Sequence, residues 1–297
     1  MVLWIPITFA AAFAQNLRSL LQKKLRSELS IWGATSARFI YAAPLAAIVA
    51  AVLWGTSDTV MTMPGIRFTG LMVVGGLAQI IATGCMIHLF SYRNFAVGTA
   101  FTKTEVLQTA LFGLVLLGEG ISLPALLAII AGLVGILLIS LPAEPGKSRF
   151  ALDGRVIYGI VSGGFFGLSA VCFRGASLAL GDGPALLRAS LTLACVLAFQ
   201  ALVISVFLKL KEAGELSRVF RAWKIAGLVG VAGMLASLGW FTAMTLENAA
   251  HVRAVGQVEI IFTILTSWFV FKEKINAREL AGLAVLTASI VALVVMA

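Results

Sequence analysis

Two carboxylates lie within long apolar stretches of this sequence, each a few residues from a cation. Glu105 follows Lys103, and Glu259 follows Arg253. A charged side chain at the centre of a bilayer costs about 2.5–3.5 kcal/mol on insertion scales, so such residues are candidates for a functional site. They could bind a polar solute or a proton, or they could form salt bridges with Lys103, Arg253 or other segments. The sequence leaves both interpretations open.

Hydroxyl groups accompany both carboxylates if the surrounding stretches are helical. At 100° per residue, Glu105 shares one helical face with Thr102 and Thr109, and Glu259 lies one turn before Thr263. This spacing predicts a hydroxyl beside each carboxylate.

Further polar residues interrupt the apolar stretches. Gln15, Asn16 and Arg18 form a polar patch near the amino terminus. A centre that holds both signs of charge would suit a zwitterion such as an amino acid. The full set of candidate substrate- or proton-binding residues is Gln15, Asn16, Arg18, Gln79, Lys103, Glu105, Trp240, Arg253, Gln257 and Glu259.

Other ionisable residues have structural interpretations. Arg38 and Arg188 occupy similar early positions in two apolar stretches. Long basic side chains near helix ends usually reach toward lipid headgroups, which is the expectation for Arg174 and Arg188. Glu119 and Glu273 each end an apolar stretch, where they are expected to pair or cap locally.

The composition is that of an integral membrane protein. Of the 297 residues, 60% are hydrophobic and 12% are charged, whereas soluble domains contain about 25% charged residues. The apolar stretches are continuous rather than alternating, which favours α-helices over barrel strands. The fold class is therefore all-α, with ten transmembrane helices. We expect them at residues 3–22, 31–54, 68–90, 95–117, 121–141, 156–178, 184–207, 224–246, 249–271 and 278–296.

An internal duplication relates the two halves of the chain. A gap-free shift that places Glu105 on Glu259 also pairs Gly76 with Gly230, Ala82 with Ala236, Asn94 with Asn248, Ala96 with Ala250, Thr109 with Thr263, Leu111 with Leu265, and Glu119 with Glu273. Because the chain has only 13 Asp and Glu residues, chance would seldom place acidic and amide residues at matching positions of the two halves, so these pairs indicate a duplication. The chain is thus divided into a five-helix repeat at 1–141, a linker at 142–155 and a second five-helix repeat at 156–297.

An odd number of helices in each repeat requires the repeats to lie upside down relative to each other. The basic residues agree, because a basic link in one repeat corresponds to a link with few or no basic residues in the other. The link at 208–223 is rich in Lys and Arg, whereas its counterpart contains only Arg67. The positive-inside rule then places 208–223 in the cytoplasm and the chain termini on the outer face.

The duplication, together with the motifs LLGEGIS at 116–122 and VFKEKIN at 270–276, resembles the drug/metabolite transporter superfamily, specifically its EamA-like ten-helix members. The resemblance covers essentially the whole chain and implies alternating access around a central cavity. Such relatives export or exchange amino acids, other small metabolites and drugs across the inner membrane. Many carry a proline where this chain has Val106 and Ile260, and their termini are commonly cytoplasmic, so this chain departs from them in both respects.

These observations predict a secondary transporter in a bacterial-type inner membrane that exports or exchanges small polar metabolites, with amino acids as the leading class. The alternatives are a flippase for a lipid or lipid-linked carrier, and a membrane assembly component without transport. The expected partners are a small-molecule substrate and membrane lipids, with coupling to a proton as an option. We expect no enzyme activity, cofactor, metal site or nucleic-acid partner, because the sequence has no Walker, HExxH, GxSxG or zinc-site spacing and its basic residues mark topology.

Overall fold

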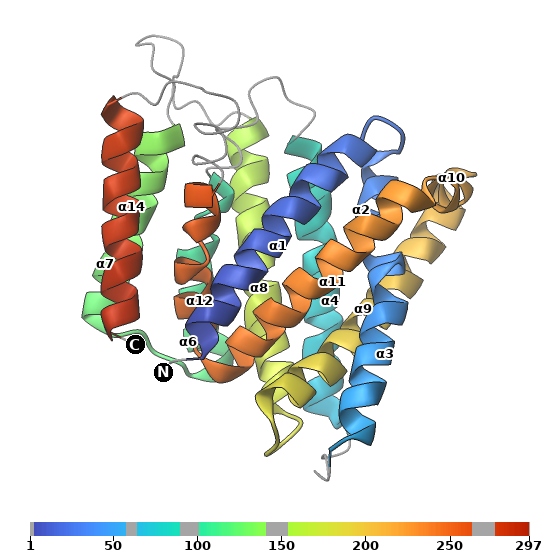
Figure 1. Ribbon diagram of the computed structural model, residues 1–297, viewed down its shortest axis with the longest axis horizontal. Helices are drawn as coiled ribbons and strands as arrows, with labels where there is room; N and C mark the ends of the chain where they lie inside the picture. Colours follow the sequence, from blue (N-terminus) through green and yellow to red (C-terminus); the bar gives the residue numbers. More distant parts are fainter. Residues whose placement is uncertain (1–2, 58–63, 90–100, 141–153, 263–276, 297) are drawn as a thin grey trace.

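The computed structural model describes residues 3–57, 64–89, 101–140, 154–262 and 277–296, and every regular element in these ranges is an α-helix (Figure 1). The elements are α1 (Trp4–Leu25), α2 (Ile31–Ile40), α3 (Ala42–Gly55), α4 (Ile66–Leu89), α6 (Glu105–Leu117), α7 (Leu123–Ser140), α8 (Gly154–Leu178), α9 (Ala185–Lys211), α10 (Glu215–Arg221), α11 (Trp223–Leu246), α12 (Ala249–Val255) and α14 (Ala277–Met296). Each of the ten expected transmembrane stretches coincides, in its described part, with one or two of these helices.

Five segments in the described residues are long and apolar enough to cross a membrane by themselves. They are Ile31–Gly55, which joins α2 and α3, and Ile66–Leu89, Val156–Leu178, Ala185–Lys211 and Trp223–Leu246. Large apolar side chains such as Ile48, Leu114 and Leu202 are exposed on the outer surfaces of the helices, as expected for surfaces that face lipid. The all-α membrane fold is therefore confirmed.

The two repeats run in opposite directions. Helix α1 leads from the end that carries both chain termini to the end that carries α10, whereas its counterpart α8 leads back (Figure 1). Helix α1 packs along α11 and α4 packs along α8, and the repeat symmetry exchanges these two contacts. Helix α3 also packs on its counterpart α9, and α6 packs on α12, the first part of the ninth expected helix. The fold is thus an inverted repeat with paired helices across the pseudo-two-fold axis.

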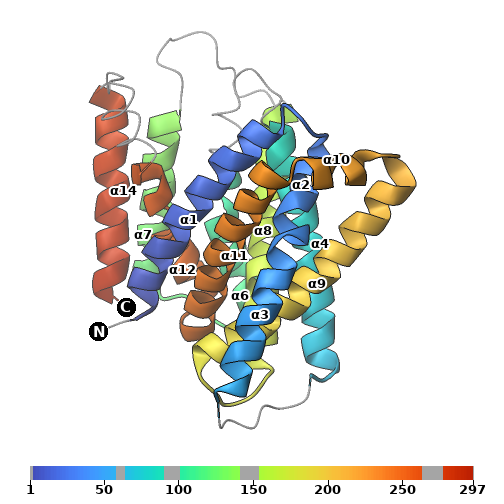
Figure 2. The same cartoon turned by 45° about the vertical axis from the view of Figure 1, so that its right-hand side comes forward.

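Helices α7 and α14 are symmetry counterparts that lie side by side at one side of the molecule in both views (Figure 2). A Cβ atom built on Gly282 would lie 2.6 Å from the carbonyl oxygen of Gly135, so the absence of side chains permits this close approach. At the symmetry-equivalent positions, Ser289 donates a 2.7 Å hydrogen bond to the carbonyl oxygen of Ala128. The duplicated sequence therefore builds a duplicated contact.

The fourth and ninth expected helices are interrupted, so the prediction of continuous helices over 95–117 and 249–271 is wrong in their described parts. A turn at 103–104 separates residues 101–102 from α6, and a turn at 256–257 separates α12 from a helical segment at 258–262. Glu105 consequently lies in the first turn of α6 rather than within an unbroken helix.

The two interruptions have equivalent hydrogen bonds. The backbone N–H of Val106 donates to Lys103 O at 3.4 Å, and that of Ile260 donates to Gln257 O at 3.0 Å. These are i to i−3 bonds, which locally tighten the helix as in a 3₁₀ turn. They fall at Val106 and Ile260, so the helix tightens at both positions although neither residue is a proline.

Candidate functional site

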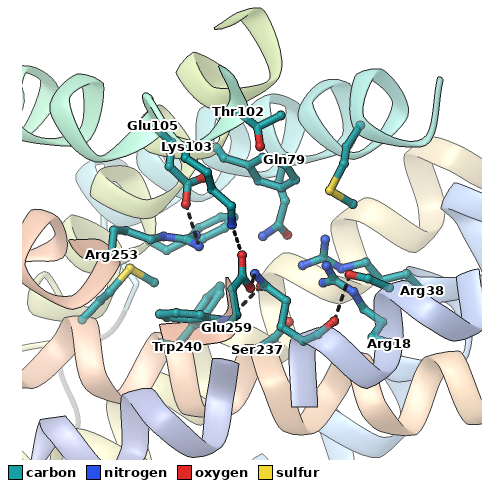
Figure 3. A pocket seen from close by; sticks show the side chains of 17 residues that line it. Arg18, Arg38, Gln79, Thr102, Lys103, Glu105, Ser237, Trp240, Arg253 and Glu259 are labelled. Carbon is teal, nitrogen blue, oxygen red and sulfur yellow. Dashed lines mark hydrogen bonds and ion pairs between the residues drawn. The ribbon is translucent and has the colours of Figure 1, made fainter. Parts of the chain in front are cut away.

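A cavity lies between the repeats near the two interruptions (Figure 3). Its empty space, including the mouth, is about 610 Å³, although the centres of water-sized molecules fit into only about 70 Å³ of it. The lining residues are Gln15, Arg18, Ser19, Arg38, Gln79, Met86, Thr102, Lys103, Glu105, Phe166, Phe173, Ser237, Trp240, Phe241, Met244, Arg253 and Glu259. The cavity therefore combines an apolar wall with charged groups of both signs.

The carboxylates of the cavity form ion pairs that cross from one repeat to the other. Lys103 Nζ contacts Glu259 Oε1, and Arg253 lies 3.9 Å from Glu105 Oε1. Lys103 and Glu105 belong to the first repeat, and Arg253 and Glu259 to the second. The helix interruptions place these side chains where they face each other, because each pair joins residues near the two turns.

An amide and an indole complete the surroundings of Glu259. Gln15 in α1 donates a 2.9 Å hydrogen bond to Glu259 Oε2 and accepts a 2.9 Å hydrogen bond from Trp240 Nε1. The guanidinium carbon of Arg253 lies 4.8 Å from the centroid of the Trp240 ring, a cation–π geometry. Trp240 can approach so closely because it packs on Gly256, where a Cβ atom would lie 2.3 Å from the ring.

Two further arginines line the opposite side of the cavity. Arg18 of α1 is 2% exposed and Arg38 of α2 is 4% exposed, and both point toward the cavity centre near Gln79 (Figure 3). Arg38 donates a 3.1 Å hydrogen bond to the Thr83 hydroxyl. Gln79 accepts a 3.0 Å hydrogen bond from Gln200. These side chains give α1 and α2 a charged surface within the membrane fold, next to neutral polar groups of α4.

Most residues that were singled out in the sequence meet in this cavity. Gln15, Arg18, Gln79, Lys103, Glu105, Trp240, Arg253 and Glu259 line it, whereas Asn16 and Gln257 do not. Gln257 instead lines a smaller adjoining pocket beside α7 and α14, and its amide donates to Arg253 O at 3.0 Å.

The hydroxyl expected beside the Glu105 carboxylate has a different partner. The Thr109 hydroxyl donates to the backbone oxygen of Glu105 at 2.6 Å instead of contacting its carboxylate, because the helix restarts at Glu105. Thr263 lies outside the described residues. Sequence reasoning gave Arg38 no role in the site, although a cation within an apolar stretch was the signal that could have identified it.

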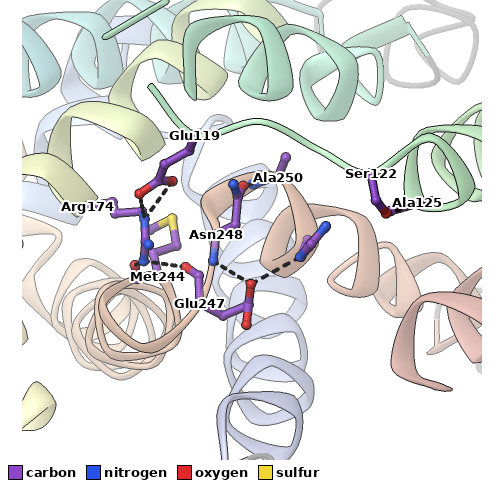
Figure 4. A network of polar contacts seen from close by, with 9 residues as sticks. Glu119, Ser122, Ala125, Arg174, Met244, Glu247, Asn248 and Ala250 are labelled. Carbon is purple, nitrogen blue, oxygen red and sulfur yellow. Dashed lines mark hydrogen bonds and ion pairs between the residues drawn. The ribbon is translucent and has the colours of Figure 1, made fainter. Parts of the chain in front are cut away.

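A second polar network joins Arg174 of α8 with Glu119 and with the end of α11 (Figure 4). Arg174 Nε donates to both carboxylate oxygens of Glu119 at 2.8 and 2.9 Å, and its Nη1 donates to the backbone oxygens of Met244 and Glu247 at 2.5 and 2.6 Å. The expectation that Arg174 reaches toward headgroups is therefore wrong, because an acidic partner and two carbonyls lie within reach. Glu119 is paired, but with an arginine of α8 rather than across its own link. Glu273 lies outside the described residues.

The described residues contain no group of three or more His, Cys, Asp or Glu side chains placed to hold a metal ion. The cavity lining itself supplies ammonium, guanidinium, carboxylate and amide groups. Such groups bind a charged or polar solute reversibly through charge-assisted hydrogen bonds.

Comparison with known proteins supports the same architecture. One solved crystal structure of a protein matches with a TM-score of 0.72 over 99% of this chain and 96% of its own, at 14% sequence identity, which is a likeness of fold alone. A comparison with curated proteins finds no match. The sequence profile of the EamA-like transporter family matches residues 2–141 and 155–295, one match for each repeat. The chain therefore belongs to the EamA-like transporter family.

Proposed function

We propose that this protein is a secondary transporter that moves small polar metabolites through the central cavity by alternating access. Family membership makes it a membrane transporter of the drug/metabolite transporter superfamily, and the proposal adds the solute class and the mechanism. Amino acids are the leading class, because ammonium and carboxylate groups of a small solute would both find partners among the cavity side chains.

The observation that carries the proposal is the pairing of charges between the repeats. The Lys103–Glu259 and Arg253–Glu105 contacts connect the two halves at the cavity wall. A movement of one repeat against the other would break these contacts, and a charged solute would compete for the same groups. Solute binding would therefore favour one arrangement of the repeats over another, which is the requirement for exchange. If transport is coupled to a proton, Glu105 and Glu259 are the groups proposed to carry it.

Counterflow into proteoliposomes tests this function. Vesicles that contain the purified protein are loaded with an unlabelled mixture of amino acids and organic acids, and the uptake of single labelled solutes is followed. At least one solute should accumulate transiently, and protein-free vesicles should show no accumulation. Translocation of a labelled lipid without any solute counterflow would replace the proposal with the flippase alternative. Absence of both activities would favour an assembly component.

We also propose a bacterial-type inner membrane location in which α10 and the 208–223 link face the cytoplasm. Helix α9 connects this link with the turn around Asp182 at the opposite end of the molecule (Figure 1). In a background without native cysteines, Ala213→Cys should react with a membrane-impermeant maleimide only after permeabilisation. Asp182→Cys, the matched control, should react in intact cells. The reverse pattern would contradict the orientation.

A further inference from the structure

Arg18 and Arg38 converge on one wall of the cavity from different helices. Their aliphatic stems meet at Gly233 of α11, where a Cβ atom would lie 3.4 Å from Arg18 Cδ and 3.5 Å from Arg38 Cγ. The two guanidinium groups repel each other, and Arg253 repels both. Three helices therefore hold two like charges together inside the membrane fold, so the arrangement is opposed by electrostatics and must be maintained by packing.

Neither arginine has an acidic partner among the residues that the structure describes. Arg18 makes no hydrogen bond or ion pair within them, and the one hydrogen bond of Arg38 is to the neutral Thr83 hydroxyl. The Nε atoms of both side chains are buried without an acceptor in the same residues. Both guanidinium groups thus retain N–H donors that have no acceptor in the described part of the chain.

The carboxylates of the cavity are occupied elsewhere. Glu259 contacts Lys103, and Glu105 faces Arg253. The described lining therefore has two more cations than carboxylates. A buried charge that has lost its ion-pair partner destabilises a protein by several kcal/mol. The interior of a membrane protein has a low dielectric constant and solvates such a charge poorly. An anion that enters the cavity would remove this imbalance.

We infer that the cavity binds small organic anions, with a carboxylate or phosphate group held between Arg18 and Arg38. Guanidinium groups suit this role because their planar N–H donors match the oxygens of both anions. Gln79 and Ser237 lie on the same cavity and supply polar groups for the remainder of the solute. The inference rests on the proposed transport function and narrows its solutes to those with net negative charge, such as acidic amino acids or dicarboxylates.

Thermal unfolding of the purified full-length protein tests the site directly. The probes are succinate, L-glutamate and inorganic phosphate, with L-leucine and L-lysine as neutral and cationic comparisons at equal ionic strength. The anions should raise the melting temperature because they bind the folded state, whereas the comparison solutes should not. The relative effects of phosphate and the carboxylates assign the preferred group. Arg18→Gln and Arg38→Gln should abolish the increase, and Arg67→Gln, at the exposed start of α4, should retain it.

The same variants separate this inference from the transport function. In counterflow, each Gln variant should raise the half-saturation concentration of the transported anion by about ten- to hundredfold, the value expected for hydrogen bonds to a charged group. Arg18→Lys keeps the positive charge but lacks the planar pair of N–H donors, so its half-saturation concentration should lie between those of the wild type and Arg18→Gln. Unchanged anion transport in both Gln variants, or counterflow of neutral and cationic solutes alone, overturns the inference and leaves the proposed function standing. Absence of all counterflow in the wild type contradicts the proposed function itself.

Discussion

Arg174 and the Arg18–Arg38 pair both lie between helices, with Arg174 the more exposed, and their hydrogen bonding differs. Arg174 has a carboxylate and two carbonyl oxygens as acceptors, all within 2.9 Å. Among the described residues, Arg38 donates one hydrogen bond, to a hydroxyl group, and Arg18 donates none. A satisfied buried charge fixes the positions of its neighbours, whereas an unsatisfied one favours any ligand that supplies the missing charge.

The position of each cation fits this difference. Arg174 connects Glu119, after α6, with the last turn of α11, and the Met244 carbonyl that it contacts belongs to a residue of the cavity wall. The Arg174 network therefore braces one end of the cavity. Arg18 and Arg38 lie in the cavity itself, where a solute can reach them.

Removal of Arg174 should have the largest effect on stability. Arg174→Gln leaves the Glu119 carboxylate without its cation and two carbonyl oxygens without a donor, which we expect to destabilise the protein by about 3 kcal/mol. Thermal unfolding in detergent measures the change. Glu119→Gln combined with Arg174→Gln should restore part of it. Arg18→Gln should unfold at the same or a higher temperature than the wild type. An equal decrease of the unfolding temperature in Arg174→Gln and Arg18→Gln would contradict the difference between the Arg174 network and the Arg18–Arg38 pair.

The paired carboxylates of the cavity are expected to matter for transport more than for folding. Glu259→Gln keeps the volume and the hydrogen bond with Gln15 but removes the charge opposite Lys103. We expect at least one of Glu259→Gln and Glu105→Gln to lower counterflow by about tenfold or more, or to remove its pH dependence, because either the solute or the moving repeats use these charges.

Membrane insertion and gel filtration of the Gln variants serve as the control. Normal transport by both variants would identify the carboxylates as packing elements. Failure caused by loss of insertion in both would have the same meaning, and the transport site would then have to involve Arg18, Gln79 and Trp240.

The smallest expected effect comes from Gly233. Gly233→Ala places a methyl group at ordinary contact distance from both arginine stems, so the protein should fold while the stems lose freedom to adjust around an anion. We expect the half-saturation concentration for the anion to rise by a few-fold, less than the tenfold that corresponds to about 1.4 kcal/mol. Gly227→Ala, in the same helix with nothing within 4 Å, is the matched control. An equal half-saturation concentration in Gly233→Ala and Gly227→Ala would show that anion binding does not depend on free movement of the arginine stems.

Much of the fold could be predicted from local features of the sequence. The apolar stretches give the helices, and the shift that pairs Glu105 with Glu259 gives the repeat, whose odd number of helices requires inversion. The interruptions at 103–104 and 256–257 could not be predicted in this way. No proline marks them, and charged side chains near them form ion pairs with the other repeat.

The sequence predicted most of the residues that line the cavity, but not which of these residues contact each other. Charged and amide residues within apolar stretches identified most of the cavity lining, because such residues are expensive in lipid. That Lys103 faces Glu259 instead of its neighbour Glu105 depends on how the two repeats cross. The convergence of Arg38 with Arg18 likewise depends on the packing of α1 and α2 against α11, which no local spacing reveals.

A crystal structure of the protein with the anion that stabilises it most tests the central claim, that the unsatisfied cations of the cavity are its solute site. The account predicts density for the carboxylate or phosphate group between the guanidinium groups of Arg18 and Arg38, with the Glu119–Arg174 network intact. An anion bound outside the cavity, with Arg18 and Arg38 in the same positions and still without a partner, would contradict it.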